Sequence, residues 1–264
     1  MDDLFDDRRL RLRLRLRARA RARIDLCALA NRLLALAPPD WEHEHEHEHE
    51  HEHDHEHDKI AGNWYQAMLG GRMLGITTAL TLMNACTMFA WWGFNTWVPS
   101  YLRAAPERGG IGLGQAAMTG LLVSSQVGMW LGYVTFGYVA DRIGRRLTYV
   151  GYLLLAALFV WLYASTRDPM TLLVLGPVTA FFATGYFSGF GAVSAELYPT
   201  AVRATAQGFT YNIGRVASAV APWLVGGLAD RQGYAAALSV TALAFVVAAP
   251  FWLIIPETRG RAIG

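Results

Sequence analysis

The chain has 264 residues, of which 53% are hydrophobic and 17% are charged, and its mean hydropathy is +0.23. Ordinary soluble domains are about 25% charged, so this composition excludes that class. The charge is also uneven, because residues 1–59 hold 11 of the 23 Lys and Arg, 15 of the 21 Asp and Glu and all eight His. The sparsely charged remainder excludes a nucleic-acid-binding domain, and two distant cysteines, Cys27 and Cys86, exclude a disulfide framework.

The first 59 residues read as a low-complexity tail. Residues 8–23 alternate Arg with Leu and then with Ala, and residues 42–58 alternate Glu or Asp with His. Closely spaced arginines repel one another and neither repeat forms a core, so we expect this tail to be disordered. The Glu-His tract suits loose Zn²⁺ or Ni²⁺ binding. The alternative is that both repeats come from a tandem nucleotide repeat read in the wrong frame.

Six apolar runs follow within residues 60–264, each long enough to cross a hydrocarbon core of about 30 Å. They cover residues 73–98, 114–140, 147–166, 170–195, 205–229 and 234–255. Gly and other small residues interrupt them, which membrane helices tolerate because neighbouring backbones can then approach closely. Arg215 is the one charged residue inside these runs. The sequence therefore predicts an all-α integral membrane protein with six transmembrane helices.

Basic residues flank the predicted spans unevenly. The side that holds both termini carries Lys59, Arg72, Arg142, Arg145, Arg146, Arg203, Arg259 and Arg261, and the other side carries Arg103, Arg108, Arg167 and Arg231. Cytoplasmic loops of membrane proteins carry the excess of Lys and Arg. We therefore expect both termini to lie in the cytoplasm, in a protein of the plasma (inner) membrane.

The loop after the second span carries the most specific motif. It reads Gly-Tyr-Val-Ala-Asp-Arg-Ile-Gly-Arg-Arg over residues 137–146. We expect Gly137 to permit close helix packing and Gly144 to permit a tight turn. Asp141 is expected to face a helix N-terminus, whose partial positive charge stabilises a carboxylate. The pattern G-x-x-x-D-R-x-G-R-R between two apolar spans resembles the cytoplasmic loop signature of the major facilitator superfamily.

Two further landmarks follow in the order found in that family. Residues 196–203 read Glu-Leu-Tyr-Pro-Thr-Ala-Val-Arg and look like the loop between the tenth and eleventh spans of its sugar and metabolite:proton carriers. Residues 256–260, Pro-Glu-Thr-Arg-Gly, resemble the segment after their last span. The resemblance maps residues 60–264 onto the seventh to twelfth spans of a twelve-span carrier, which is the C-terminal half of that fold.

The resemblance implies a cytoplasmic charge network that latches the carrier in its outward-facing state. Its candidate gate residues are Gly137, Asp141, Arg142, Gly144, Arg145, Arg146, Glu196, Arg203 and Arg215. The alternative for Glu196 and Arg203 is simple solvation at the membrane interface. Arg215 would lie about 15 Å below the cytoplasmic surface. At that depth it joins the network, faces a substrate cavity or snorkels toward water.

The substrate site of such carriers lies at mid-membrane between the two halves. The candidate contacts near the middle of the spans are Trp91, Trp92, Asn95, Gln126, Tyr186 and Asn212. Each alone is more often a helix-packing residue than a ligand contact. The paired tryptophans suit stacking on a planar ligand and Arg215 suits a carboxylate. The sequence thus favours proton symport of an organic or aromatic acid over transport of a sugar.

Six spans are half of the twelve that the family has. The expected partners are therefore the lipid bilayer and either a missing N-terminal half or a second copy, and the alternative is a six-span remnant that transports nothing. No Asp or Glu lies inside the runs, so a proton-coupling carboxylate would belong to the other half. A metal transporter is disfavoured because the runs contain no His and only Cys86 as a ligand. We expect no enzymatic activity, no cofactor and no nucleic-acid partner.

Overall fold

The computed structural model describes residues 68–259. The chain divides into two units, Met1–Glu56 and His57–Gly264, and the described residues all belong to the second. The predicted tail over residues 1–59, with its Glu-His tract, lies outside the described residues. Its disorder, its metal binding and its boundary therefore stay predictions.

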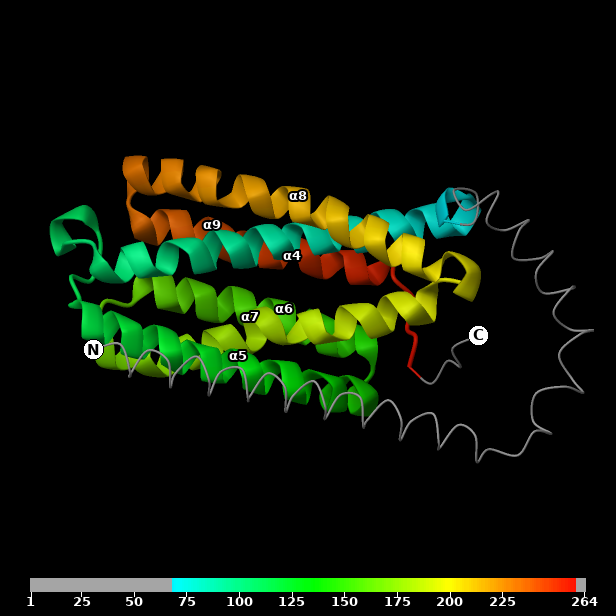
Figure 1. Ribbon diagram of the computed structural model, residues 1–264, viewed down its shortest axis with the longest axis horizontal. Helices are drawn as coiled ribbons and strands as arrows, with labels where there is room; N and C mark the ends of the chain where they lie inside the picture. The colour runs from blue at the N-terminus through cyan, green and yellow to red at the C-terminus, as the bar shows by residue number, and fades with distance from the viewer. Residues whose placement is uncertain (1–67, 260–264) are drawn as a thin grey trace, which may run out of the picture. The chain divides into compact units, whose positions relative to one another are not determined.

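Every regular element within residues 68–259 is helical, which confirms the all-α prediction. The α-helices are α4 (Gly71–Arg103), α5 (Gln115–Ile143), α6 (Arg145–Ser165), α7 (Pro169–Leu197), α8 (Thr200–Gln232) and α9 (Tyr234–Ala248). They run roughly along one common axis (Figure 1), with the short 3-10 helices η2 (Pro106–Arg108) and η3 (Ala249–Leu253) at their ends. Each α-helix coincides with one predicted apolar run, although α8 begins at Thr200 rather than near residue 205.

Short connections reverse the chain between successive helices. Gly144 is the single residue between α5 and α6, and Gly233 is the single residue between α8 and α9, with φ angles of +104° and +83°. A positive φ is costly for a residue with a Cβ atom, so glycine makes these tight reversals. Asp168 precedes α7 and accepts hydrogen bonds from the Thr171 N–H and hydroxyl, both at 2.7 Å, which caps that helix.

Four helical segments are long and apolar enough to cross a membrane by length and composition. They are α4, α6, α7 and the continuous segment Tyr234–Leu253, with mean hydropathies between 1.4 and 2.0. The helices α5 and α8 are as long, at 29 and 33 residues, but they carry interior polar groups such as Gln126 and Arg215. Their crossing of the membrane therefore stays a prediction. Such polarity suits helices that face protein or a water-filled cavity rather than lipid.

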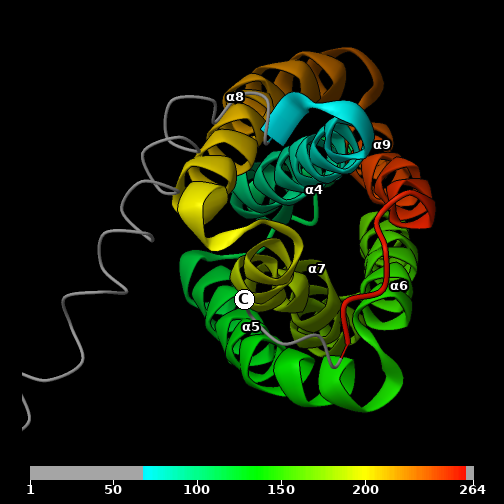
Figure 2. The ribbon, with the colours of Figure 1, turned by 90° about the vertical axis from the view of Figure 1, so that its right-hand side faces the viewer.

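The helices pack in pairs. α5 lies on α7 and α4 lies on α8, while α6 and α9 close one side of the bundle and α5 and α8 lie at the opposite side (Figure 2). Between α5 and α7 the backbones touch, because a Cβ atom at Gly128 or Gly132 would clash with the carbonyl groups of Pro177 and Phe181. Small residues permit this approach, which gains van der Waals contact inside a membrane.

The α4–α8 pair is held by side chains that reach the partner's backbone. The Asn84 carboxamide donates to the Thr210 carbonyl at 3.2 Å, and the Trp97 indole N–H donates to the Pro222 carbonyl at 2.8 Å. The second bond uses a carbonyl near a helix-interior proline. These two bonds fix the register of the parallel helices at two levels.

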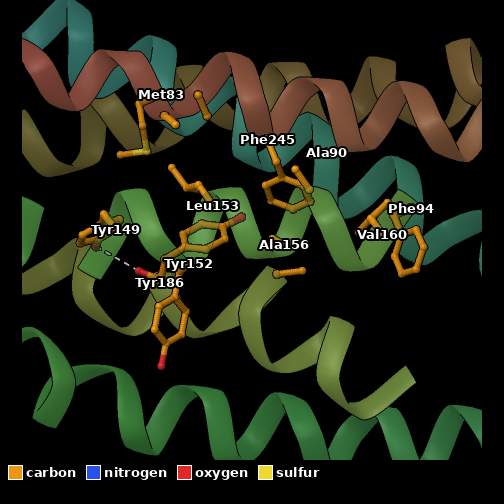
Figure 3. Close-up of a cluster of buried hydrophobic side chains, with 14 of the residues drawn as sticks. Met83, Ala90, Phe94, Tyr149, Tyr152, Leu153, Ala156, Val160, Tyr186 and Phe245 are labelled. Carbon is orange, nitrogen blue, oxygen red and sulfur yellow. Dashed lines mark hydrogen bonds between the residues drawn. The ribbon is translucent and has the colours of Figure 1, made fainter. Parts of the chain in front are cut away.

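An aromatic core joins both pairs to α6 and α9. Tyr149 of α6 stacks on Trp252 of η3 with ring centroids 4.2 Å apart, and Phe136 of α5 meets Tyr149 edge-on at 4.8 Å. The Tyr149 hydroxyl donates to the Tyr186 carbonyl of α7 at 3.0 Å (Figure 3). Buried hydroxyls of this kind are retained where they find a partner. The core thus leaves the side between α5 and α8 for the candidate site.

Candidate functional site

Three predicted gate residues meet where α5 ends, α6 begins and α7 ends. The Arg145 guanidinium donates to the Asp141 carboxylate at 2.6 Å and to the Glu196 carboxylate at 3.0 Å. The side chains of Arg145 and Glu196 are 15% and 10% exposed, whereas that of Asp141 is 65% exposed. A shielded charge is costly to leave without its partner, while an exposed one is solvated by water. Glu196 therefore depends on Arg145 far more than Asp141 does.

Two residues after the last helix complete this group. The Thr258 hydroxyl donates to the Glu196 carboxylate. The Glu257 carboxylate accepts hydrogen bonds from the backbone N–H groups of Arg145 and Arg146, at 2.9 and 3.0 Å. These N–H groups begin α6 and have no partner within that helix, so Glu257 caps it and meets the positive end of its dipole. We call Asp141, Arg145, Glu196, Glu257 and Thr258 the charge cluster.

Glu257 takes the role that the sequence suggests for Asp141. Partial burial opposes its ionisation, but four backbone N–H groups, those of Arg259, Arg146, Arg145 and Thr258, outweigh burial and hold the pKa of Glu257 below its ordinary value. The motif Pro-Glu-Thr-Arg-Gly marks this segment in the sequence, but nothing local in it tells which helix the carboxylate caps.

The two motif glycines have different surroundings. Gly144 makes the expected tight turn, and a Cβ atom there would also lie 3.0 Å from a Glu257 carboxylate oxygen. A Cβ atom at Gly137 would meet no atom within 4 Å in the described part of the chain. Close packing against another helix of residues 68–259 is therefore not what requires a glycine at position 137.

The other predicted gate residues lie outside the charge cluster. Arg146 contributes its backbone N–H to Glu257, as described above. Arg203 donates to the Thr200 hydroxyl at 3.1 Å. Arg142 is exposed, in the last turn of α5. Among the interactions of the described residues, the ion pairs bring together Asp141, Arg145 and Glu196 of the predicted network.

A hollow of about 350 Å³ lies between the helix pairs. Four helices line it, with Met88, Trp91, Trp92, Tyr133, Phe187, Phe190, Gly191 and Tyr211. We call it the aromatic hollow. Trp91 and Trp92 are predicted substrate contacts. The other aromatic residues of the lining could not be found from the sequence. They come from α5, α7 and α8, and an apolar run does not tell which side of its helix faces another helix. Its volume falls in the range of small-molecule sites.

Arg215 stands beside the aromatic hollow. Its guanidinium carbon lies 5.9 Å from the centroid of the Tyr211 ring, which is within cation–π range. Because α8 begins at Thr200, Arg215 lies about 22 Å along this helix, deeper than the sequence suggests. Neither ion pair found in the described residues involves Arg215. The acidic residues of this part lie at helix ends or in connections.

A second, smaller space adjoins the aromatic hollow. It has a volume of about 30 Å³ and is lined by Trp91, Phe94, Asn95, Val98, Leu122, Ser125, Gln126, Met129, Tyr163, Gly176 and Ala180. We call it the polar recess. It brings together three predicted substrate contacts, Trp91, Asn95 and Gln126, from two helices. Gly176 and Tyr163 carry no sequence signal that marks them as its neighbours.

The remaining two candidates lie elsewhere. Tyr186 is 2% exposed and its hydroxyl donates to the Thr87 carbonyl at 3.3 Å, so its hydrogen-bonding group is already occupied inside the bundle. Asn212 is exposed on α8 and donates to the Gly208 carbonyl at 2.7 Å, within its own helix. Neither lines the aromatic hollow or the polar recess, and their contact with substrate stays a prediction.

Comparisons with known proteins agree with this architecture. A family model described as Major Facilitator Superfamily matches residues 80–263. A putative metabolite transport protein of Haemophilus influenzae is 32% identical over 191 residues, which cover 71% of this chain and 45% of that protein. The cis,cis-muconate transport protein of Acinetobacter baylyi is 34% identical over 142 residues, which cover 54% of this chain and 33% of that protein.

The fold has a solved counterpart in the crystal structure of the peptide transporter POT. The TM-score is 0.57 at 14% identity, over 67% of this chain and 37% of that one. This likeness concerns the fold alone. The chain spans less than half the length of the curated relatives named above. Helices, loop motif and family match together show that the chain belongs to the major facilitator superfamily of multi-pass membrane transporters.

Proposed function

We propose that this chain is one half of a secondary carrier that moves a small planar carboxylic acid, together with protons, across a membrane by alternating access. The observation that carries the proposal is the aromatic hollow with Arg215 at its side. Aromatic faces stack on a planar ligand, and a guanidinium binds a carboxylate through parallel hydrogen bonds. The similarity to a protein named for muconate transport supports this substrate class.

We propose six membrane crossings. The helices α5 and α8 are as long as the four apolar segments and run along the same axis (Figure 1). Gln126 of α5 lines the polar recess, and Arg215 of α8 lies against Tyr211 of the aromatic hollow. A polar lining of this kind makes the lower hydropathy of the two helices tolerable. The excess of Arg at the end that carries the charge cluster supports cytoplasmic termini in the plasma (inner) membrane.

The substrate site is completed by another protein surface. In carriers of this kind the ligand binds at mid-membrane between two repeats, and here the hollow lies between α4, α5, α7 and α8 on one half alone. We propose that an N-terminal half or a second copy of this chain covers it. A chain without either would bind the acid without transporting it.

The charge cluster is proposed as the cytoplasmic gate. Arg145 and Glu196 are mostly shielded and hold α6 against α7, whereas Asp141 is exposed beside them. An exposed carboxylate next to a fixed cation is available to a donor on the opposite half when the cytoplasmic side closes. Closure there is the outward-facing state of the cycle.

Proton coupling is assigned outside the described helices. Within residues 68–259, Asp and Glu lie at helix ends and in connections, and a coupling carboxylate is expected inside the membrane. We therefore propose that it belongs to the completing half. A second copy of residues 68–259 would not supply this carboxylate. Proton-coupled transport would therefore favour an N-terminal half over a second copy as the surface that completes the site.

Binding to the purified chain in lipid nanodiscs tests the site. Benzoate, a planar carboxylate, is expected to bind the wild type, and Arg215→Gln is expected to weaken binding at least tenfold, because a charge-assisted hydrogen bond contributes about 1.5–3 kcal/mol. Arg231→Gln, at the far end of the same helix, is the matched control and should bind as the wild type does. No saturable binding by the wild type would refute the site.

Uptake into proteoliposomes separates the carrier from the remnant. Uptake of radiolabelled benzoate under an inward proton gradient, beyond the passive entry of benzoic acid into protein-free liposomes and lost in Arg215→Gln, would show that the chain transports by itself. Binding without uptake would show that it needs its completing half or that it is a remnant, and coexpression with the N-terminal half of the muconate relative then decides between these two.

A further inference from the structure

We propose that the polar recess is a subsite for one small hydrogen-bonding substituent at the end of the substrate opposite its carboxylate, and that Gly176 sets the size of that subsite. This inference rests on the proposed function. It narrows the substrate from any planar acid to an acid with a second polar group, such as a hydroxyl, at its far end.

The size of the polar recess limits what enters it. Its volume of about 30 Å³ holds one or two water-sized groups. Phe94, Tyr163 and Ala180 are buried and form its inner wall, while Asn95 and Gln126 are exposed and form its mouth. A hydroxyl or a single carbonyl oxygen fits such a space, and an aromatic ring does not.

The polar groups at the mouth have no protein partner. Within the described residues, neither the Asn95 nor the Gln126 carboxamide hydrogen-bonds another protein group. Asn95 lies about 12 Å along α4 from the end of that helix at Arg103. A carboxamide at this depth needs a partner, because an unpaired polar group away from water is costly. Water satisfies it in the empty state and a substituent of the ligand replaces that water.

Ser125 adds an acceptor to the same wall. Its hydroxyl donates to the Leu121 carbonyl at 2.9 Å, which leaves lone pairs of its oxygen for a donor in the recess. With the two carboxamides, the recess offers both donors and acceptors. A hydroxyl, which donates and accepts, uses this combination better than a methyl group or a halogen does.

The recess lies at a fixed height above Arg215. The bonds Asn84–Thr210 and Trp97–Pro222 set the register of α4 and α8. In this register the backbone of Arg215 lies beside position 89 of α4. That position is about 9 Å from Asn95 along the helix axis, toward the start of α4. Trp91 lines both the aromatic hollow and the polar recess, so the two spaces adjoin. In the proposed pose, an acid with its carboxylate at Arg215 lies along the aromatic hollow and has its far end in the recess.

Gly176 keeps the recess open. A Cβ atom at this position would lie 2.6 Å from the Ser125 hydroxyl oxygen and 3.8 Å from a Tyr163 ring carbon. An alanine would thus fill the recess and displace the Ser125 hydroxyl. The hydroxyl can rotate, so we expect Gly176→Ala to fold. The double variant Ser125→Ala, Gly176→Ala removes the close contact and still fills the space.

Two probes that differ only at the far end test the subsite. We expect the full chain in nanodiscs to bind 4-hydroxybenzoate about tenfold more tightly than benzoate, because a site built to hydrogen-bond a hydroxyl discriminates against the analogue that lacks it. Gly176→Ala and the double variant should bind both acids with the affinity of the wild type for benzoate. Gly151→Ala, where a Cβ atom meets nothing within 4 Å, is the matched control in α6 and should keep the tenfold preference.

The outcomes separate the two proposals. Equal affinity of the wild type for the two acids, or an unchanged preference in both Gly176 variants, overturns the subsite and leaves the acid site standing. Absence of binding of either acid to the wild type overturns the proposed function and the subsite with it. A preference that only the Gly176 variants lose supports the subsite.

Discussion

Polar groups have opposite surroundings in the charge cluster and at the face of the bundle that carries the aromatic hollow and the polar recess, which we call the open face. In the charge cluster, Arg145 bonds two carboxylates and Glu257 accepts two backbone N–H groups of α6. At the open face, neither Asn95 nor Gln126 hydrogen-bonds another group of residues 68–259, and Arg215 lies against an aromatic ring. In the charge cluster, the polar groups bond one another and hold the helix ends together. The open face keeps its polar groups available for a ligand.

This difference separates stability from function. A group with protein partners leaves a buried charge or an orphaned donor when it is removed, so its loss destabilises the fold. A group that only water satisfies leaves nothing unpaired, so its loss affects binding alone. Variants in the two regions are therefore expected to fail in different assays.

The largest expected effect is in the charge cluster. Arg145→Gln leaves the shielded Glu196 carboxylate without its guanidinium, and we expect the free energy of unfolding to fall by about 2 kcal/mol. Asp141→Asn is the matched control on the other side of the same arginine, and its exposed pair should cost less than about 0.5 kcal/mol. Equilibrium unfolding in mixed micelles measures both. Equal losses would contradict the assignment of shielded and exposed partners.

Two asparagines on α4 form a matched pair for which we expect the next largest effect on the free energy of unfolding. Asn84 is buried and donates to the α8 backbone, whereas Asn95 is exposed at the mouth of the recess. Asn84→Ala should lower the free energy of unfolding by about 1 kcal/mol, the net contribution of such a hydrogen bond. Asn95→Ala should leave unfolding unchanged and weaken 4-hydroxybenzoate binding. Destabilisation by Asn95→Ala would mean that it has a structural partner.

The smallest effect concerns Glu257 and depends on pH. The folded-state pKa of Glu257 is lowered, so its contribution is complete above the unfolded value of about 4.3 and is lost as pH falls through the folded value. We expect Glu257→Gln to cost about 0.5 kcal/mol at neutral pH, because the carboxylate is exposed and screened. At low pH the variant and the wild type should become equally stable.

A matched substitution controls for the general effect of removing a carboxylate. Glu107, in η2, accepts no hydrogen bond within the described residues, so Glu107→Gln should show no such pH-dependent difference. Unfolding of the three proteins over a pH series makes the comparison. A constant gap between Glu257→Gln and the wild type at all pH values would argue against capping by the charged form.

Much of the helix layout was predictable, because membrane helices are long and their apolar runs are local. The turn at Gly144 was equally predictable, since a positive φ follows from one residue's lack of a Cβ atom. Asp141, Arg145 and Glu196 were predictable as a group from the loop motifs. The capping of α6 by Glu257 was not predictable, because Glu257 and Arg145 lie more than a hundred positions apart in the sequence.

The residues of the candidate site likewise divide into those that the sequence could predict and those that it could not. Trp91 stands out in the sequence because paired tryptophans suit stacking on a planar ligand, and Asn95, Gln126 and Arg215 stand out because polar groups are costly inside apolar runs. Tyr186 stands out for the same reason, yet its hydroxyl is bonded within the bundle. Gly176 does not stand out at all, because a glycine in a membrane helix usually serves packing.

The sequence by itself determined the class of the protein, its helices, its turns and the residue types available for a gate and an acid site. Apolar runs, charge and local conformational limits depend only on residues that are near each other in the sequence, so the sequence alone reveals them. Only the tertiary structure decided that Glu257 caps α6 and that Asn84, rather than Asn95, bonds the backbone of α8. It also decided that Gly176 lines the polar recess. Those choices depend on helix register and on contacts between segments far apart in the chain, where a shift of one residue turns a side chain about 100° around its helix.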